Sequence, residues 1–297
     1  MHYHRAALLR EATDSLKVQG GVYVDATFGG GGHSREILKR MGPSGKLIAF
    51  DVDKDACENR IYDKRFCLVN KNFMTIKESL EDLKIAVVDG ILADLGVSSH
   101  QFDTPLRGFS MRFDAPLDMR MDSTSVITAK QVVNTYAEKS LVSVLRNNGE
   151  VRRAKFFAQK IMEAVKNRQM ETTGDLKRTI EKHVPHRIAN KVLAQVFQAL
   201  RIEVNGELKS LEKLLTQSLQ LLRKGGRLVL ISYHSLEDRL VKHFLRDGNF
   251  EGIQNKDFYG NRIVPFKKVG RLVTPTLQEI KENPRVRSAK LRVAEKL

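Results

Sequence analysis

Short apolar runs recur along the first third of the chain. They occur at residues 22–27, 46–51, 65–70 and 89–95. The segments between them, such as SREILKRM at residues 34–41, place apolar side chains at helical spacing. Strand-like runs that alternate with helical segments predict an α/β fold built on a parallel sheet.

This alternation stops after Asp94. Residues 99–122 form an irregular stretch with two prolines and a glycine, and residues 127–202 then follow a helical pattern throughout, with capping-box spacing at Thr135 and Glu138. Another strand-like run, RLVLISYHS, begins at Arg227. We therefore expect one α/β domain, formed by residues 1–106 and 203–297, which is interrupted by a helical insert at residues 107–202.

Four consecutive glycines, Gly29 to Gly32, follow the first predicted strand and precede the first helix of the α/β pattern. Without Cβ atoms, such a turn can adopt positive φ angles and approach a ligand closely. Sheets that bind nucleotide-like cofactors begin in this way. The alternative is a mobile glycine linker. A nicotinamide oxidoreductase is disfavoured, because the last glycine of its G-x-G-x-x-G spacing is Ser34 here.

Polar or aromatic side chains follow each of the first four predicted strands. Asp25 ends the first strand and could accept a hydrogen bond from a cofactor ammonium group. Asp51 lies about 20 residues beyond the glycines, where an acidic side chain holds ribose hydroxyls. Phe73 could flank an adenine ring, and Asp94 ends the fourth strand. Because carboxyl ends of parallel strands form the ligand crevice of open sheets, we expect the cofactor there.

The composition adds a preference for a polyanionic partner. Lys and Arg number 51 against 35 Asp and Glu, which gives a net charge of +16. The two cysteines, Cys57 and Cys67, have no metal-site spacing, so we expect reduced thiols and no bound metal. The first residues contain no apolar stretch of membrane-spanning or signal-peptide length. We expect a soluble cytoplasmic protein without a membrane partner.

Seven segments together resemble the bacterial 16S ribosomal RNA (cytosine-N4)-methyltransferase family. In chain order they are DATFGGGGHS, DGILADLGVSS, RGFSMR, PLDMRMD, FQALRIEVNGEL, GGRLVLISYHSLEDR and NPRVRSAKLR. The resemblance implies a Rossmann-like class I S-adenosylmethionine-dependent methyltransferase with an inserted all-helical domain for substrate recognition. It also implies that the substrate is the exocyclic amino group of a decoding-region cytidine in small-subunit RNA. The cofactor-binding residues it implies are Gly31, Gly32, His33, Asp51, Phe73, Asp94 and Gln101.

The chemistry of this reaction suggests the catalytic candidates. Methyl transfer from a sulfonium is an in-line displacement, so the protein mainly aligns the two reactants and excludes water. A cytosine amino nitrogen is a weak nucleophile, and acceptors of its N–H hydrogen bonds would activate it. We therefore take Asp94, Ser98 and Ser99 as candidate catalytic residues, together with backbone carbonyls near Leu95.

Candidate RNA-binding residues each have a structural alternative. They are Arg112, Asp118, Arg120, Arg201, Asn205 and His234. Asp118 and Arg120 could instead form an ion pair that shapes their loop, and Arg201 and Asn205 share one helix face and could brace it. His234 precedes Ser235, which we expect to cap the next helix. The implied partner is ribosomal RNA in an assembled or nearly assembled small subunit. The alternative function is that of a non-catalytic ribosome-assembly factor. The sequence does not distinguish a monomer from a homodimer.

Overall fold

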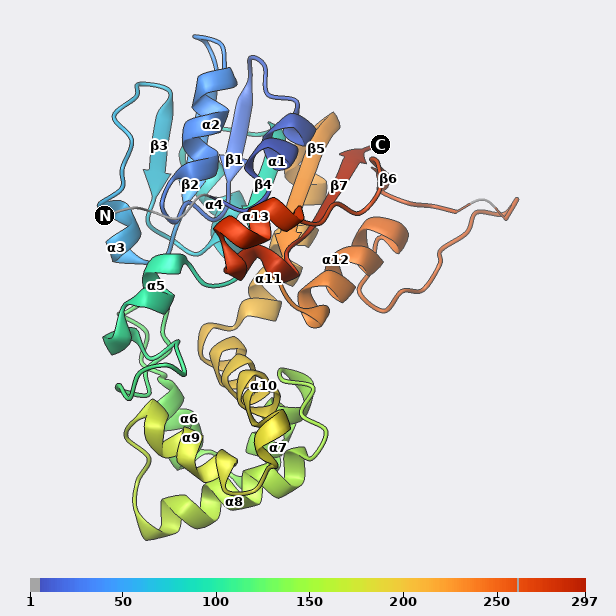
Figure 1. The fold of residues 1–297 in the computed structure, drawn as a ribbon. Coiled ribbons are helices and arrows are strands. Elements are labelled where there is room, and N and C mark those ends of the chain that lie inside the picture. Colours follow the sequence, from blue (N-terminus) through green and yellow to red (C-terminus); the bar gives the residue numbers. More distant parts are fainter. Residues whose placement is uncertain (1–5, 261) are drawn as a thin grey trace. The chain divides into compact units, whose positions relative to one another are not determined.

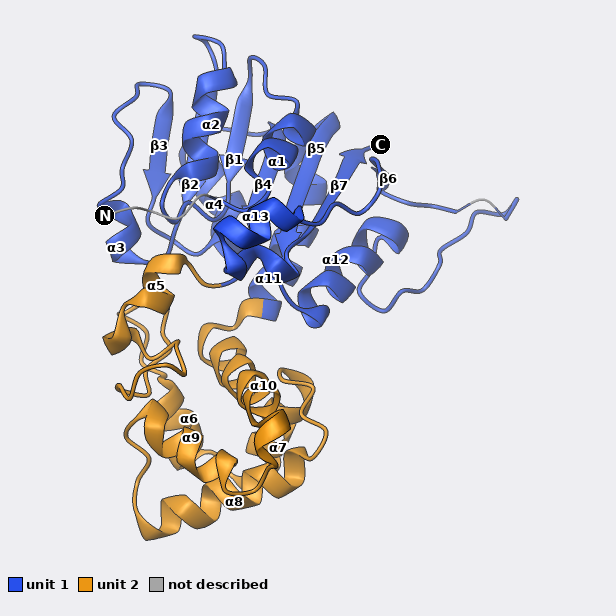
Figure 2. Cartoon of the chain, viewed as in Figure 1, with its two compact units in different colours: residues 1–96, 208–297 blue, residues 97–207 orange. Residues whose placement is uncertain are grey.

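The computed structural model describes residues 6–260 and 262–297, and the chain divides into two compact units (Figure 2). Unit 1 comprises residues 1–96 and 208–297, and unit 2 comprises residues 97–207. The helical insert expected at residues 107–202 lies within unit 2. No helix among the described residues is long and apolar enough to cross a membrane.

Unit 1 is built on a seven-stranded sheet with the order β3-β2-β1-β4-β5-β7-β6 (Figure 1). The strands are β1 (Val22–Asp25), β2 (Lys46–Phe50), β3 (Phe66–Val69), β4 (Val88–Asp94), β5 (Leu222–Ser232), β6 (Phe266–Lys268) and β7 (Lys290–Lys296). Strands β1 to β5 pair in parallel, and β7 is antiparallel to both β5 and β6. The expected parallel sheet is confirmed, with an antiparallel edge added. Chain order reverses between β1 and β4, the place where open α/β sheets bind ligands.

Helices cover both faces of this sheet. On one face, Val24 and Ile91 pack with helices α4, α11 and α12, and on the other, Tyr23 and Leu92 pack with α1 and α2. Successive strand residues point to opposite faces, so a strand covered on both sides has to be apolar throughout. This explains the continuous apolar runs of the sequence. The helices are α1 (Leu9–Leu16), α2 (Gly32–Arg40), α3 (Lys54–Cys57), α4 (Ile76–Asp82), α11 (Glu207–Leu221), α12 (Ser235–Asp247) and α13 (Leu277–Glu282).

Unit 2 is helical and has its own apolar core. Its helices are α5 (Ser99–Asp103), α6 (Ala129–Thr135), α7 (Glu138–Asn147), α8 (Ala154–Asn167), α9 (Thr173–Glu181) and α10 (His186–Asn205). Helix α10 buries Leu193, Val196 and Leu200 at the predicted helical spacing. Leu117 and Met119 of the irregular stretch are buried in the same core. This stretch is therefore packed against the helices, which is why the unit begins earlier in the chain than residue 107.

The capping box predicted at Thr135 and Glu138 is wrong. Thr135 ends α6, and α7 begins after Ala137 without a side-chain cap. The capping boxes of unit 2 instead begin at Ser98, Thr128 and Thr172, where the side-chain oxygen accepts from the backbone N–H three residues later. Spacing alone does not show whether the first residue of such a pair is extended or already helical, and that conformation decides the cap.

Candidate active site

The turn between β1 and α2 is hydrogen-bonded to the strands on either side of β1. Backbone N–H groups of Ala26 and Phe28 donate to Leu92 O of β4 and Phe50 O of β2, each at 2.8 Å. The hydroxyl oxygen of Thr27 accepts from the backbone N–H of Asp94 at 2.7 Å. The turn is therefore held at the chain reversal between β1 and β4, and the mobile-linker alternative does not fit it.

The glycines of this turn serve different purposes. Gly29 and Gly31 have φ angles of 51° and 73°, which glycine adopts without strain. A Cβ at Gly31 would lie 2.9 Å from the Phe28 ring, and one at Gly32 would lie 2.9 Å from Ala6 Cβ. A Cβ at Gly29 would meet nothing within 4 Å. Packing within the protein thus requires Gly31 and Gly32, whereas the backbone at Gly29 borders open space.

Three carboxyl groups, of Asp25, Asp51 and Asp94, lie at the carboxyl ends of β1, β2 and β4. Burial raises the pKa of each to about 6. Asp25 is fully buried, and its two oxygens accept from Ser34 Oγ at 2.7 Å and from the backbone N–H of Thr27 at 3.2 Å. Through these contacts the buried Asp25 side chain holds the turn in place. The expected bond to a cofactor ammonium group does not fit this buried position.

Asp51 connects the glycine turn to the end of β2. Its Oδ2 accepts from the backbone N–H of Gly29 at 2.7 Å, and its Oδ1 accepts from the backbone N–H of Asp53 at 2.9 Å. A carboxylate oxygen can accept more than one hydrogen bond, so both oxygens retain capacity for a ligand. Asp53 itself caps α3, because its side chain accepts from the backbone N–H of Asp55.

Asp94 is the centre of a buried polar cluster. Its Oδ1 accepts from the Tyr233 hydroxyl at 2.8 Å, and its Oδ2 lies 3.8 Å from His33 Nδ1. The other ring nitrogen of His33 lies 3.1 Å from Ala7 O, and burial lowers the pKa of this imidazole. Burial and the nearby Asp94 raise the pKa of Tyr233 well above its ordinary value. The cluster therefore presents a carboxyl group, 19% exposed, whose neighbours are a neutral phenol and a neutral imidazole.

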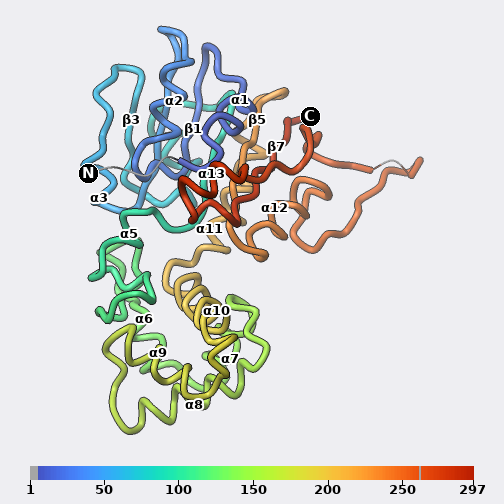
Figure 3. Tube along the Cα trace, in the orientation of Figure 1, coloured from blue at the N-terminus to red at the C-terminus, as the bar shows by residue number. Residues whose placement is uncertain are grey.

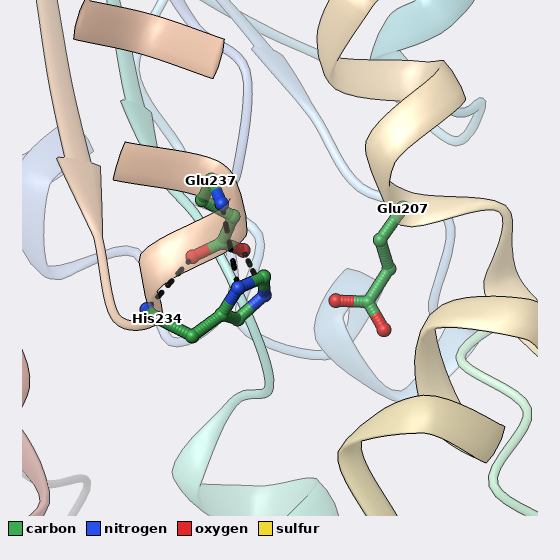
Figure 4. A group of neighbouring side chains, drawn as sticks. All are labelled: Glu207, His234 and Glu237. Atoms are coloured by element: carbon green, nitrogen blue, oxygen red, sulfur yellow. Dashed lines mark hydrogen bonds and ion pairs between the residues drawn. The ribbon is translucent and has the colours of Figure 1, made fainter. Parts of the chain in front are cut away.

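The turn after β5 positions Tyr233 through the next residues His234 and Glu237, whose side chains lie side by side (Figure 4). His234 caps α12, and the Glu237 side chain accepts from the backbone N–H of Tyr233 at 2.9 Å. The prediction that Ser235 caps this helix is wrong, because Ser235 is already its first residue. His234 Nε2 lies 3.2 Å from Glu237 Oε1, so the structural role of His234 is well supported. Figure 4 also labels Glu207, which begins α11.

The remaining predicted catalytic and cofactor residues lie in capping or loop positions. Phe73 is half-buried in the short helix η1 (Phe73–Thr75), next to the core. Ser98 Oγ accepts from the backbone N–H of Gln101, and Gln101 Oε1 accepts from the backbone N–H of Ser98 at 3.0 Å. Ser99 is the first residue of α5. Ligand contacts for these residues stay predictions.

Most predicted RNA-binding residues of unit 2 make internal contacts. The Arg120 guanidinium forms a bidentate pair with Asp118 at 2.8 and 2.7 Å, and it also donates to backbone carbonyls at Ser123 and Ser125. These bonds support the loop-shaping alternative for both residues. Arg112 differs, since its side chain is 62% exposed and its internal contacts are long, with Asp103 Oδ1 and Ser110 Oγ each at 3.3 Å.

The pair on α10 holds the same loop. Asn205 Oδ1 accepts from the backbone N–H of Met121 at 2.7 Å, and its amide group donates to Met119 O and Arg201 O, each at 2.8 Å. Arg201 donates to both carboxyl oxygens of Glu207, at 2.8 and 2.9 Å. The bracing alternative therefore accounts for the positions of Arg201 and Asn205.

Comparisons with known proteins agree along the whole chain. A family model described as the MraW methylase family matches residues 1–297. A Flavobacterium johnsoniae protein named ribosomal RNA small subunit methyltransferase H is 54% identical, over 100% of this chain and 99% of that protein. Proteins of the same name from Cytophaga hutchinsonii and Bacteroides fragilis (strain YCH46) are 51% and 48% identical, each over 99% of this chain and over 99% and 97% of their own lengths.

Proposed function

The chain belongs to the MraW methylase family, and on that premise we propose that it methylates the exocyclic amino group of one cytidine in the decoding region of small-subunit (16S) ribosomal RNA. S-adenosylmethionine is the methyl donor of this family. The curated relatives are named for small-subunit ribosomal RNA, which supports the RNA class. The amino group and the cytidine rest on the resemblance of the sequence motifs. The substrate is an assembled or nearly assembled subunit in the cytoplasm.

The glycine turn fits a nucleotide-like cofactor. The supporting feature is the open space beside Gly29, whose N–H is bonded to the Asp51 carboxylate. We assign the ribose hydroxyls of the cofactor to Asp51 and one face of its adenine to Phe73. Gly31, Gly32 and His33 support this surface from within. When bound, S-adenosylmethionine supplies an electrophilic methyl group on a sulfonium.

The single observation that carries the proposal is the position of Asp94. Its carboxyl group is partly exposed at the chain reversal, beside the glycine turn. The Tyr233 hydroxyl donates to this carboxyl group, and Thr27 holds the backbone N–H of Asp94. An amino group that donates an N–H to this carboxylate is oriented by it, and its nitrogen lone pair gains nucleophilic character. Once it bonds to the methyl carbon, the amino nitrogen is positively charged and has to lose a proton. Asp94 accepts that proton. The raised pKa of Tyr233 keeps its phenol protonated as a donor to Asp94.

Analysis of the methylated nucleoside tests the proposal. Purified protein is incubated with deuterium-labelled S-adenosylmethionine and with small subunits or protein-free 16S RNA that lack the modification. We expect N4-methylcytidine at a single position by mass spectrometry, with assembled subunits the better substrate. Asp94→Asn keeps the shape but removes the proton acceptor, and it should lower kcat by at least about 100-fold. A label on a ring carbon or on another nucleoside would contradict the proposal.

A further inference from the structure

A basic groove lies on unit 1 between α12, β6 and β7. We call it the α12 groove. It has a volume of about 290 Å³, and five cationic side chains line it: Lys242, Arg246, Lys268, Arg271 and Arg292. The other lining residues are leucines and valines, so no acidic side chain belongs to the described lining. None of these residues belongs to the glycine turn or to the Asp94 cluster.

Three of the five cations are available to an outside ligand. Arg246 pairs with Asp247, and Arg292 donates to Asp238 at 2.7 Å. Lys242, Lys268 and Arg271 are exposed, and within the described part of the chain no carboxylate forms an ion pair with them. A cluster of cations without internal partners favours binding of a polyanion such as a phosphodiester backbone.

An arm whose described residues are 249–260 and 262–265 starts at the end of α12 and returns to β6, so it joins two walls of the groove (Figure 3). Its strands meet through an antiparallel bridge between Lys256 and Arg262. Phe258 and Tyr259 occupy the turn of this hairpin, are 97% and 86% exposed, and have ring centroids 5.7 Å apart. Phe250 stacks on Phe244 of α12 and holds the base of the arm. The arm therefore presents two aromatic rings outside the core.

We propose that the α12 groove and the arm form a second RNA-binding surface, separate from the methyl-transfer site. The unpaired cations bind phosphates, and Phe258 and Tyr259 stack on unpaired bases. A basic groove combined with exposed aromatic rings is a combination by which proteins bind single-stranded nucleic acid, because cations follow the backbone and every base has a face that can stack. This inference rests on the proposed function only for the identity of the bound RNA, which we take to be the ribosomal substrate.

The electrostatic part is tested with the triple variant Lys242→Ala, Lys268→Ala, Arg271→Ala. Its control, Lys46→Ala, Lys64→Ala, Lys224→Ala, removes three exposed lysines at the amino ends of β2, β3 and β5. Affinity for a single-stranded RNA oligonucleotide and for small subunits is measured between 50 and 200 mM salt. Three lost phosphate contacts should reduce the slope of log affinity against log salt concentration by about 2. Over that salt range, wild-type affinity should then fall about 20-fold more than the affinity of the groove variant. Equal slopes for both triple variants would overturn the proposal.

The stacking part is tested with Phe258→Ala and Tyr259→Ala, and the control is Tyr62→Ala, since Tyr62 is 97% exposed on another loop of unit 1. Each arm variant should lose about 5- to 150-fold in oligonucleotide affinity with an unchanged salt slope. Affinity equal to that of Tyr62→Ala would overturn this part. Loss of a dimer by sedimentation, with RNA affinity unchanged, would instead show that the arm contacts a second copy. Binding is measured without methyl donor, so failure of the methylation assay would leave this result intact.

Discussion

Replacing Gly29 by alanine tests whether the glycine turn binds the cofactor. The added methyl group would enter open space, so it does not disturb the packing of the protein itself. Gly42→Ala is the matched control, because a Cβ at Gly42 also meets nothing within 4 Å and Gly42 lies outside this turn. The two changes add the same methyl group, and only one of them lies where we place the ligand.

The expected effects on stability and affinity can be separated. Gly29 has a φ of 51°, and an L-residue in the left-handed region costs roughly 1–2 kcal/mol of unfolding free energy. Gly42 has no positive φ, so alanine there should leave stability unchanged or raise it by up to about 1 kcal/mol. Overpacking a ligand-binding site by one methyl group costs about 1–3 kcal/mol of binding free energy, which corresponds to a loss of roughly 5- to 150-fold in affinity.

Calorimetry with S-adenosylhomocysteine gives the affinities, and urea unfolding without ligand gives the stabilities. We expect Gly29→Ala to remain folded but to bind weakly, with Gly42→Ala similar to wild type in both measurements. Gly31→Ala adds a comparison, because its Cβ would overlap the Phe28 ring and should lower stability further. The reasoning is refuted if Gly29→Ala and Gly42→Ala bind S-adenosylhomocysteine equally well, since the space beside Gly29 would then be only solvent.

Three further changes follow from the same geometry. Asp51→Ala removes the acceptor for the ribose hydroxyls and should weaken S-adenosylhomocysteine binding by about 1.5–3 kcal/mol in calorimetry, and unchanged affinity would remove Asp51 from the site. The pKa of Asp25 is raised to about 6, so the folded state gains stability as pH falls from about 7 to 4. In urea unfolding, Asp25→Asn should flatten this pH dependence and add up to about 3 kcal/mol of unfolding free energy at pH 7. A loss of stability with an unchanged pH profile would contradict the raised pKa of Asp25. Arg120→Ala should lower the melting temperature while Arg112→Ala should only reduce the salt slope of RNA binding, and the opposite pattern would contradict the loop-shaping role of Arg120.

The sheet was predictable because its strands are buried on both faces. Apolar residues fit such positions best, and continuous runs such as residues 47–50, all fully buried, therefore mark the strands. The placement of Asp51 and Asp94 follows from the same fact, since a polar residue directly after a buried strand lies at the edge of the sheet. The role of Asp53 as a helix cap was predictable from local chemistry alone, because it depends on two neighbouring residues.

Contacts between distant residues were not predictable. Tyr233 is the clearest omission, since the sequence places it after the strand β5 but gives no sign that its hydroxyl meets Asp94, 139 residues away along the chain. The loop around Arg120 is a second example. Its sequence shows an acidic and a basic residue two positions apart, whereas the carbonyl partners at Ser123 and Ser125 depend on how the loop closes. Such partners decide whether an arginine is available to RNA.

The charge at the carboxyl ends of β1, β2 and β4 favours a cationic ligand. Asp25, Asp51 and Asp94 form no ion pair with any lysine or arginine among the described residues, and burial raises the pKa of each. At neutral pH the ligand-free protein therefore carries negative charge that its own side chains do not compensate, at a cost in stability. Tyr233 and His33 do not offset that charge, because both are neutral there. S-adenosylmethionine, the methyl donor of the family, carries a positively charged sulfonium, and its product lacks that charge. We therefore expect these carboxylates to favour the donor over the product and to promote release of S-adenosylhomocysteine after transfer.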